Sequence, residues 1–337
     1  MAGETFNEYG KAEAVALLFE GSGFEHVEAP SFTPEAGSVI RTSSRVFLEG
    51  VDFDLTYFPL KHLGYKCVVA QTAGLYASMS HPRLLSVRLA LSSKLDFSHV
   101  RELWSGVLAA AREHGYKSLD LDLVPSPNGL AVSVSAVGEE YKFTSGRRAV
   151  ARSKDLICVS GSLGAAYIGQ QILEREKKAF EKTADDSAQP DLEKYKMMIG
   201  GYLKPEVSPS AVTRLEDTGI VPSCGYVISH GLSDALKRLV HDTNLGAKVY
   251  ADKIPFEGNS FAFGKDLDID PVSAAMNGGD DFRLLYVIPI LDAEKFRREF
   301  QTFDIIGHLA QSDVGAVLVA PGGAELPIKA QGWHNED

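Results

Sequence analysis

The stretch from Asp155 to Phe180, DLICVSGSLGAAYIGQQILEREKKAF, decides the fold of the second half of the chain. LICV predicts a buried strand, SGSLG predicts a tight glycine turn, and the residues after it keep the apolar spacing of a long helix. Backbone N–H groups at such a strand–helix junction can hold a phosphate group. A packing role for the same glycines is equally consistent with the pattern, so Gly161 and Gly164 are candidate phosphate-binding residues on one of two readings.

A second passage of the same kind, GYVISHGLSDAL, covers Gly225 to Leu236. It predicts a buried strand, a turn and the start of a helix, and His230 lies in the turn. A metal ion held at this place would need carboxylates, whereas the passage offers Val227, Ser229 and His230. His230 is therefore either a polar residue at the mouth of a cleft or a ligand-binding group.

The first half of the chain also alternates strands and helices. A helix is expected over His99–Tyr116, because Val100, Leu103, Val107 and their neighbours form one apolar stripe that ends at Gly115. Apolar and polar residues alternate in the expected strands VFLEGVDF (46–53), LLSVRLALSS (84–93), SLDLDLV (118–124) and LAVSVSAVG (130–138). The basic passage 141–155 interrupts the pattern. We expect an α+β protein of two domains, 1–146 and 147–337.

The composition of the chain argues against several classes of function. The chain has 337 residues and a formal net charge of −11, which argues against a broad nucleic-acid surface. No stretch has the length of a membrane span or a signal peptide, so a cytoplasmic protein is expected. Cys67, Cys158 and Cys224 are far apart and lie in apolar runs, which favours reduced thiols over a disulfide or a metal site.

Several segments together resemble a known family. They are EGVDFDLTYFPLKHLGYK (49–66), DLICVSGSLGAAYIGQQILERE (155–176), YLKP (202–205), SHGLSDAL (229–236), NGGDDFRLLYVIP (277–289) and KAQGW (329–333). In this order they resemble thiamine-monophosphate kinase, particularly its Bacteroidetes-type versions, over nearly the whole chain. The resemblance implies the aminoimidazole ribonucleotide synthetase-like fold: a homodimer whose amino-terminal sheets pair into a barrel that binds ATP near the interface, and a carboxy-terminal α/β sandwich.

The family reaction moves the γ-phosphate of ATP onto thiamine monophosphate and gives thiamine diphosphate. Such a transfer needs carboxylates that fasten Mg²⁺ against the nucleotide, so ATP and Mg²⁺ are the cofactors wherever activity is kept. The family's metal-binding aspartates fall in this chain on Arg45, Gly74, Ala165, Val227 and His230. With unit charges about 4 Å apart worth roughly 4 kcal/mol at an effective dielectric of 20, a cationic Arg45 should repel the metal ion.

Other family positions are kept. Asp122 and Asp280 match family carboxylates and are the expected metal ligands, and Asp120 and Asp281 would complete a rebuilt metal site. The residues expected to contact a ligand or phosphate are Arg45, Glu49, Asp52, Arg148, Gly161, Gly164, His230, Asp281 and Trp333.

These observations leave three readings open. The favoured one is a catalytically impaired member that acts as a dimeric phosphate- or nucleotide-ligand binding or regulatory protein. The second is a working ATP-dependent kinase with a rebuilt metal site, and the third is a structural partner of an intact paralogue in mixed dimers. In the first reading, Arg45, Arg148 and His230 hold an anion without metal. Alternatively, Arg45 is consumed by a surviving carboxylate such as Asp281. We expect neither a nucleic-acid nor a membrane partner.

Overall fold

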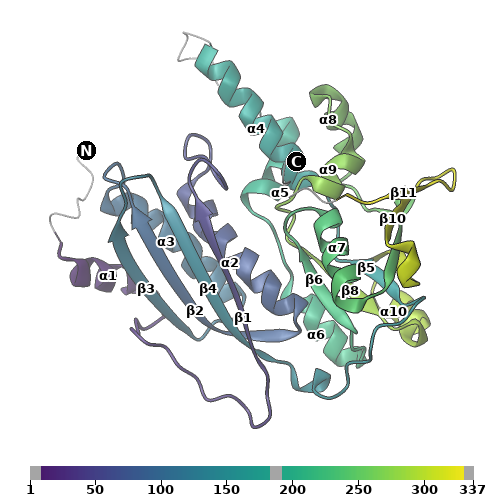
Figure 1. Ribbon diagram of the computed structural model, residues 1–337. Helices are drawn as coiled ribbons and strands as arrows, with labels where there is room; N and C mark the ends of the chain where they lie inside the picture. Colours follow the sequence, from purple (N-terminus) through teal and green to yellow (C-terminus); the bar gives the residue numbers. More distant parts are fainter. Residues whose placement is uncertain (1–8, 183–191, 330–337) are drawn as a thin grey trace, which may run out of the picture. The chain divides into compact units, whose positions relative to one another are not determined.

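The computed structural model describes residues 9–182 and 192–329 (Figure 1). The chain divides into two compact units, Met1–Lys142 and Phe143–Asp337. The division lies a little before the boundary expected after residue 146, at the start of the basic passage. Within the described ranges, no helix is both long enough and apolar enough to cross a membrane.

The amino-terminal unit is one four-stranded sheet with helices packed on one face. Its elements are α1 (Lys11–Phe19), β1 (Ile40–Leu48), α2 (Leu60–Ala77), β2 (Ser80–Leu91), α3 (Phe97–Glu113), β3 (Ser118–Pro125) and β4 (Ala131–Glu140). The short 3-10 helix η1 (Lys142–Thr144) contains the division between the two units. The strand order is β1-β4-β2-β3. All neighbours are antiparallel except β2 and β3, which run parallel.

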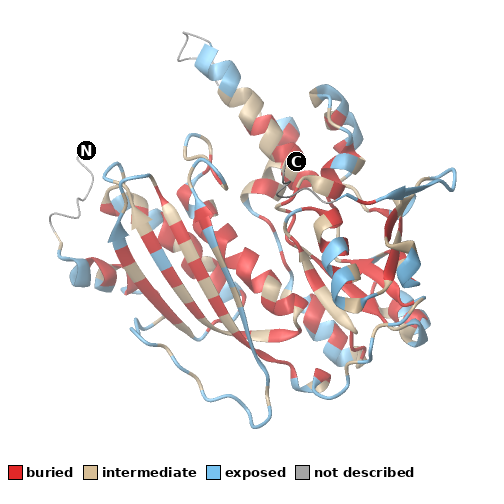
Figure 2. Ribbon diagram, viewed as in Figure 1, coloured by how far each residue is buried: buried red, intermediate tan, exposed pale blue. Residues whose placement is uncertain are grey.

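Alternating burial along the strands explains which sheet face the helices cover (Figure 2). In β4 the residues Val132, Val134 and Ala136 are fully buried, while the serines between them are half-buried. Helices α2 and α3 pack closely because Gly64 and Gly106 lie where they cross; a Cβ on Gly106 would come within 1.9 Å of the Lys61 carbonyl oxygen. The core of this unit therefore lies between the sheet and these two helices.

Two sequence expectations in this unit need adjustment. The first strand begins at Ile40 rather than at Val46, because the polar residues RTSS form part of an exposed edge strand and show no apolar alternation. It ends at Leu48, and Glu49–Phe53 form a turn. The helix expected from His99 begins at Phe97, where the Asp96 carboxylate accepts a hydrogen bond from the His99 backbone N–H.

The carboxy-terminal unit contains a seven-stranded sheet of order β11-β10-β7-β9-β5-β8-β6. Its strands are β5 (Leu156–Val159), β6 (Cys224–Ile228), β7 (Gly246–Tyr250), β8 (Arg283–Ile288), β9 (Asp304–Ala310), β10 (Ala316–Val319) and β11 (Glu325–Pro327). Its α-helices are α4 (Ala165–Lys182), α5 (Lys196–Leu203), α6 (Pro209–Thr218), α7 (Leu232–Thr243), α8 (Ser260–Leu267), α9 (Pro271–Asn277) and α10 (Ala293–Glu299). Short 3-10 helices lie at η2 (Glu193–Tyr195), η3 (Ala251–Lys253), η4 (Ile290–Asp292) and η5 (Ser312–Val314).

Both faces of this second sheet are covered. On one face Leu236 and Leu239 of α7 pack in one core with Leu285 of β8. On the other face Tyr286 stacks on Phe303, which also contacts Phe296 of α10. The expected strand–turn–helix of residues 155–180 is confirmed as β5 and α4, and the unit is the α/β sandwich that the family resemblance implied.

Candidate functional site

The start of α4 is organised by a buried carboxylate. Asp281 lies just before β8, and its two carboxylate oxygens accept hydrogen bonds from the backbone N–H groups of Gly164 (2.8 Å) and Ala166 (3.3 Å). Gly164 is required here because its φ is +81° and a Cβ would come within 2.8 Å of the Ala275 nitrogen. Two N–H groups that could have cradled a phosphate are thus occupied by the protein's own carboxylate.

Burial also changes the chemistry of Asp281. It raises the pKa of the carboxyl group to about 7, against the two backbone hydrogen bonds, which lower it. Ala165, which stands at an expected metal position, is the first residue of α4 and is itself buried.

A polar pocket of about 240 Å³ opens beside this helix start. Among its lining residues are Ser162, Lys196, Gly200, Lys204, Glu206, Glu257, Asp281 and Arg283. Arg283 donates through Nε to the Ser162 carbonyl oxygen (3.4 Å) and through Nη1 to that of Glu206 (2.8 Å). Sequence reasoning missed Arg283, although it lies only two residues after Asp281.

The turn that carries His230 lies against the turn that carries Asp280. The Asp280 N–H donates to the Ser229 carbonyl oxygen (2.9 Å), and Asp280 has a φ of +60°. His230 is exposed, and its Nδ1 lies 3.1 Å from the Ser229 hydroxyl oxygen. Val227 contributes its carbonyl oxygen, which accepts a hydrogen bond from Arg238 (2.7 Å). The structure therefore brings together two of the expected ligand positions, His230 and Asp280.

Arg45 forms an ion pair within the amino-terminal unit. Its Nη2 lies 2.7 Å from Oδ1 of Asp52, and Oδ2 of Asp52 accepts a hydrogen bond from the Leu48 N–H (2.8 Å). The side chains are only 24% and 15% exposed, and the guanidinium also lies 4.9 Å from the centre of the Phe47 ring. Arg45 is thus paired with a carboxylate, as the alternative reading expected, and the carboxylate is Asp52.

Glu49 and Gly74 have local structural roles. Oε2 of Glu49 accepts a hydrogen bond from the Leu130 N–H (2.6 Å) and so ties the end of β1 to the turn before β4. Gly74 lies in α2 against β1, where a Cβ would come within 2.4 Å of the Ser43 hydroxyl oxygen. That hydroxyl donates to Gln71 (2.9 Å), so the space that an aspartate at position 74 would need is filled.

The carboxylates expected to hold a metal ion in this unit are engaged by cations. Asp120 accepts hydrogen bonds from Arg88 (2.6 Å) and Ser86 (2.9 Å). Asp122 forms an ion pair with Lys11, whose hydrogen bond lowers the pKa of the carboxyl group. A divalent cation needs oxygen ligands free of such partners, so these two residues as arranged do not fit Mg²⁺. Across the described ranges, no three His, Cys, Asp or Glu side chains gather as a metal site would need.

Two further candidates lie apart from these groups. Arg148 is half-buried in the basic passage, and its charge acts on the thiol of Cys224. Burial is the larger influence on that thiol and raises its pKa to about 12. Cys224 is a free cysteine of intermediate burial. Trp333 lies outside the described residues.

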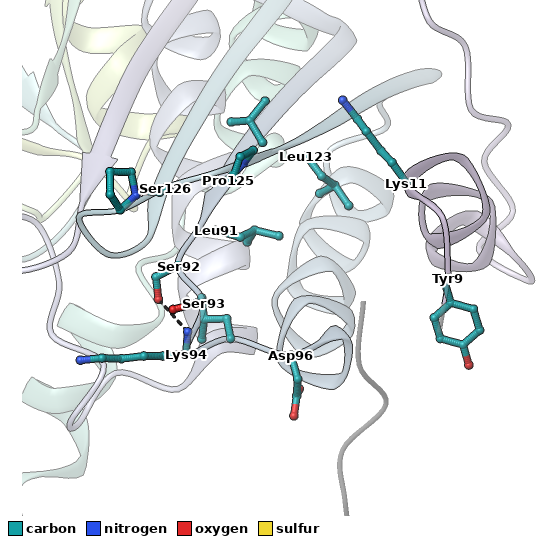
Figure 3. Close-up of a pocket in the computed structure, with 13 residues that line it drawn as sticks. Tyr9, Lys11, Leu91, Ser92, Ser93, Lys94, Asp96, Leu123, Pro125 and Ser126 are labelled. Atoms are coloured by element: carbon teal, nitrogen blue, oxygen red, sulfur yellow. Dashed lines mark hydrogen bonds between the residues drawn. The ribbon is translucent and has the colours of Figure 1, made fainter. Parts of the chain in front are cut away.

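The amino-terminal unit contains a larger cavity that the sequence did not indicate (Figure 3). It measures about 950 Å³ and lies at the carboxyl ends of the parallel strands β2 and β3, where Leu91 and Leu123 form part of its wall. Tyr9, Lys11 and Asp96 also line it. Only the parallel pairing of β2 with β3 could have pointed to it, and the sequence did not predict that pairing.

Comparisons with known proteins agree over most of the chain, although no family model matches it. The thiamine-monophosphate kinase of Synechococcus elongatus is 26% identical over 291 residues, covering 85% of this chain and 84% of that protein. The enzyme of the same name from Aquifex aeolicus is 24% identical over 244 residues, covering 72% of this chain and 74% of that protein. The solved structure of AaThiL complexed with AMPPCP and TMP has a TM-score of 0.72 at 20% identity and covers 97% of both chains. Over most of its length the chain is therefore similar to thiamine-monophosphate kinases, and it has the aminoimidazole ribonucleotide synthetase-like fold.

Proposed function

We propose that this chain is a catalytically impaired member of the thiamine-monophosphate kinase family. It binds a phosphate- or nucleotide-type ligand without a metal clamp and acts as a dimeric binding or regulatory protein. The observation that carries the proposal is the ion pair of Arg45 with Asp52. The family resemblance puts a metal-binding aspartate at position 45. This chain has a cation there, and the nearest acid is committed to it.

Two more positions support impairment. Gly74 has its space taken by Ser43, and Asp281 uses both carboxylate oxygens on the start of α4. An active kinase with a rebuilt site would have to take Asp120 and Asp122 away from Arg88 and Lys11. Binding a metal ion would therefore cost the free energy of both ion pairs. The contacts that the structure shows agree better with an impaired protein than with a rebuilt metal site.

The proposal is tested by measuring ADP release with ATP, Mg²⁺ and thiamine monophosphate, with the Aquifex aeolicus kinase assayed in parallel. We expect turnover far below the roughly 1–100 s⁻¹ typical of kinases. Calorimetric titration with AMPPCP and with thiamine monophosphate, both in EDTA, then measures binding alone. Turnover comparable with the parallel enzyme would refute impairment, and the lack of binding by either compound at millimolar concentration would refute a ligand-binding role.

The dimer is proposed from the edge strand β1. β1 lies at the edge of its sheet, so its outer backbone groups have no neighbouring strand within the unit. Its apolar residues Ile40, Val46 and Leu48 are also 41%, 52% and 43% exposed. Pairing with a second copy would remove this liability. Light scattering should give twice the mass of one chain at micromolar concentration; the mass of a single chain would contradict the dimer.

A further inference from the structure

The pocket beside α4 contains a cation held in place by neutral groups. Both side-chain hydrogen bonds that the structure shows for Arg283 go to backbone carbonyl oxygens, those of Ser162 and Glu206. In the part of the chain that the structure describes, Arg283 forms no ion pair with a carboxylate. A guanidinium has more N–H donors than these two bonds use. Its position is therefore fixed while its charge stays available to a ligand.

The other charged groups of the pocket have partners of their own. Lys204 lies 3.8 Å from Glu206, Lys196 lies 3.4 Å from Glu193, and Glu257 accepts a hydrogen bond from the Ser162 hydroxyl. Asp281 acts on Arg283 electrostatically, but its oxygens bond to the start of α4. Among the charged residues that line the pocket, Arg283 is thus the one to which an anionic ligand could supply the missing ion-pair partner.

The backbone leaves the guanidinium accessible on one side. Gly161 has a φ of +119°, and a Cβ there would lie 3.6 Å from the guanidinium carbon of Arg283. Because this position is glycine, no side chain covers that face of the group. Gly200 also lines the pocket, and a Cβ added to it would meet no atom within 4 Å, so this side of the pocket is open as well.

We propose that this pocket binds a phosphate group of a phosphomonoester, or free phosphate, with Arg283 as the residue that contacts its oxygens. A guanidinium fits two phosphate oxygens at once through paired charge-assisted hydrogen bonds. The volume of about 240 Å³ suits a phosphate group better than a whole nucleotide. This inference rests on the proposed ligand-binding function and specifies which group of the ligand is held, and where.

The test is a titration of the full chain with inorganic phosphate and with pyrophosphate in EDTA, followed by calorimetry and by the shift in melting temperature. Arg283→Ala should lower the affinity about tenfold or more, because it removes charge-assisted hydrogen bonds. Arg283→Lys should retain part of it. Lys265→Ala removes a positive charge from an exposed position of the same unit and should leave binding unchanged.

A second pair of variants leaves Arg283 in place and so avoids a folding defect at that residue. Gly200→Glu and Gly200→Gln add side chains of similar size to α5, but only the first adds a negative charge. The Glu variant should bind phosphate several-fold more weakly than the Gln variant.

Failure of this inference can be told apart from failure of the proposed function. Suppose that the chain binds AMPPCP or thiamine monophosphate in EDTA. If phosphate then does not bind, or if the Arg283 and Gly200 variants all bind it as the parent chain does, the phosphate site at Arg283 is refuted and the proposed function stands. If the variants weaken phosphate binding while the ADP assay shows full turnover, the site stands and the impaired function is wrong.

Discussion

Two arginines, one in each unit, have opposite surroundings. Arg45 gives its Nη2 to the carboxylate of Asp52, whereas Arg283 gives its N–H groups to two carbonyl oxygens. A carboxylate cancels the charge of a guanidinium, and a carbonyl only orients it. A cation at a motif position is therefore not always available to a ligand, and an available cation can lie outside the motif positions.

Space differs between the two regions in the same way. At Gly74 the Ser43 side chain fills the room that a longer residue would need, while at Gly200 an added Cβ would meet open space. The amino-terminal position is therefore closed to a new side chain, and the carboxy-terminal pocket is open to one.

The largest expected effect follows from restoring an aspartate at the closed position. Gly74→Asp should lower the free energy of unfolding by about 3 kcal/mol or more, because it overpacks α2 against β1 and places a carboxylate at a half-buried position. Urea unfolding measures the loss. The matched control is Gly200→Ala, another helix glycine, which should be neutral or slightly stabilising. Adding Ser43→Gly to Gly74→Asp should recover part of the loss; equal stability of Gly74→Asp and the parent chain would show that this position is not closed.

The second effect concerns the carboxylate that caps α4. Asp281→Ala leaves the N–H groups of Gly164 and Ala166 without their acceptor and should cost about 2 kcal/mol. Asp281→Asn keeps one acceptor oxygen and should cost less. Hydrogen exchange at the two amides reports the same change locally, and unchanged protection in the Ala variant would contradict the capping role.

The sequence predicted some of these features better than others. The strand–turn–helix of residues 155–180 was predictable because its glycines and apolar spacing act locally. The pair of Asp281 with Gly164 was not, since it joins residues 117 positions apart through the order of β5 and β8. The sequence did not predict the partner of Arg45 for a local reason. Arg45 and Asp52 are only seven positions apart, but they meet because the chain turns after Leu48, and the expected strand ran on to residue 53.

The third effect comes from removing the ion-pair partner of Arg45, which should make its guanidinium available to a ligand. Asp52→Ala removes the partner of Arg45 and the acceptor of the Leu48 N–H, and should cost about 1–2 kcal/mol in urea unfolding. In an Arg283→Ala background it should also create phosphate binding that the background lacks. Asp52→Asn, which keeps an acceptor for Leu48 but loses the charge, should give the binding at a smaller cost. If neither variant gains phosphate binding, pairing with Asp52 is not what keeps Arg45 from a ligand.

The smallest effect tests whether the amino-terminal unit keeps its interior groups neutral as well as paired. His114 is buried; its Nδ1 lies 3.1 Å from the Tyr76 hydroxyl oxygen, and its Nε2 has no hydrogen-bond partner among the described residues. Burial lowers the pKa of His114 below 6.5, and the charge of Glu113 opposes the shift only in part.

As the pH falls below 6.5, the imidazole of His114 therefore takes up a proton in the unfolded chain before it does so in the folded chain. The stability that neutral His114 contributes is complete above 6.5 and is lost as the pH falls toward the lowered value. Between neutral pH and mildly acidic pH the parent chain should lose more free energy of unfolding than His114→Gln, measured as the difference between their urea unfolding curves. Parallel curves at both pH values would mean that His114 does not stay neutral in the folded unit.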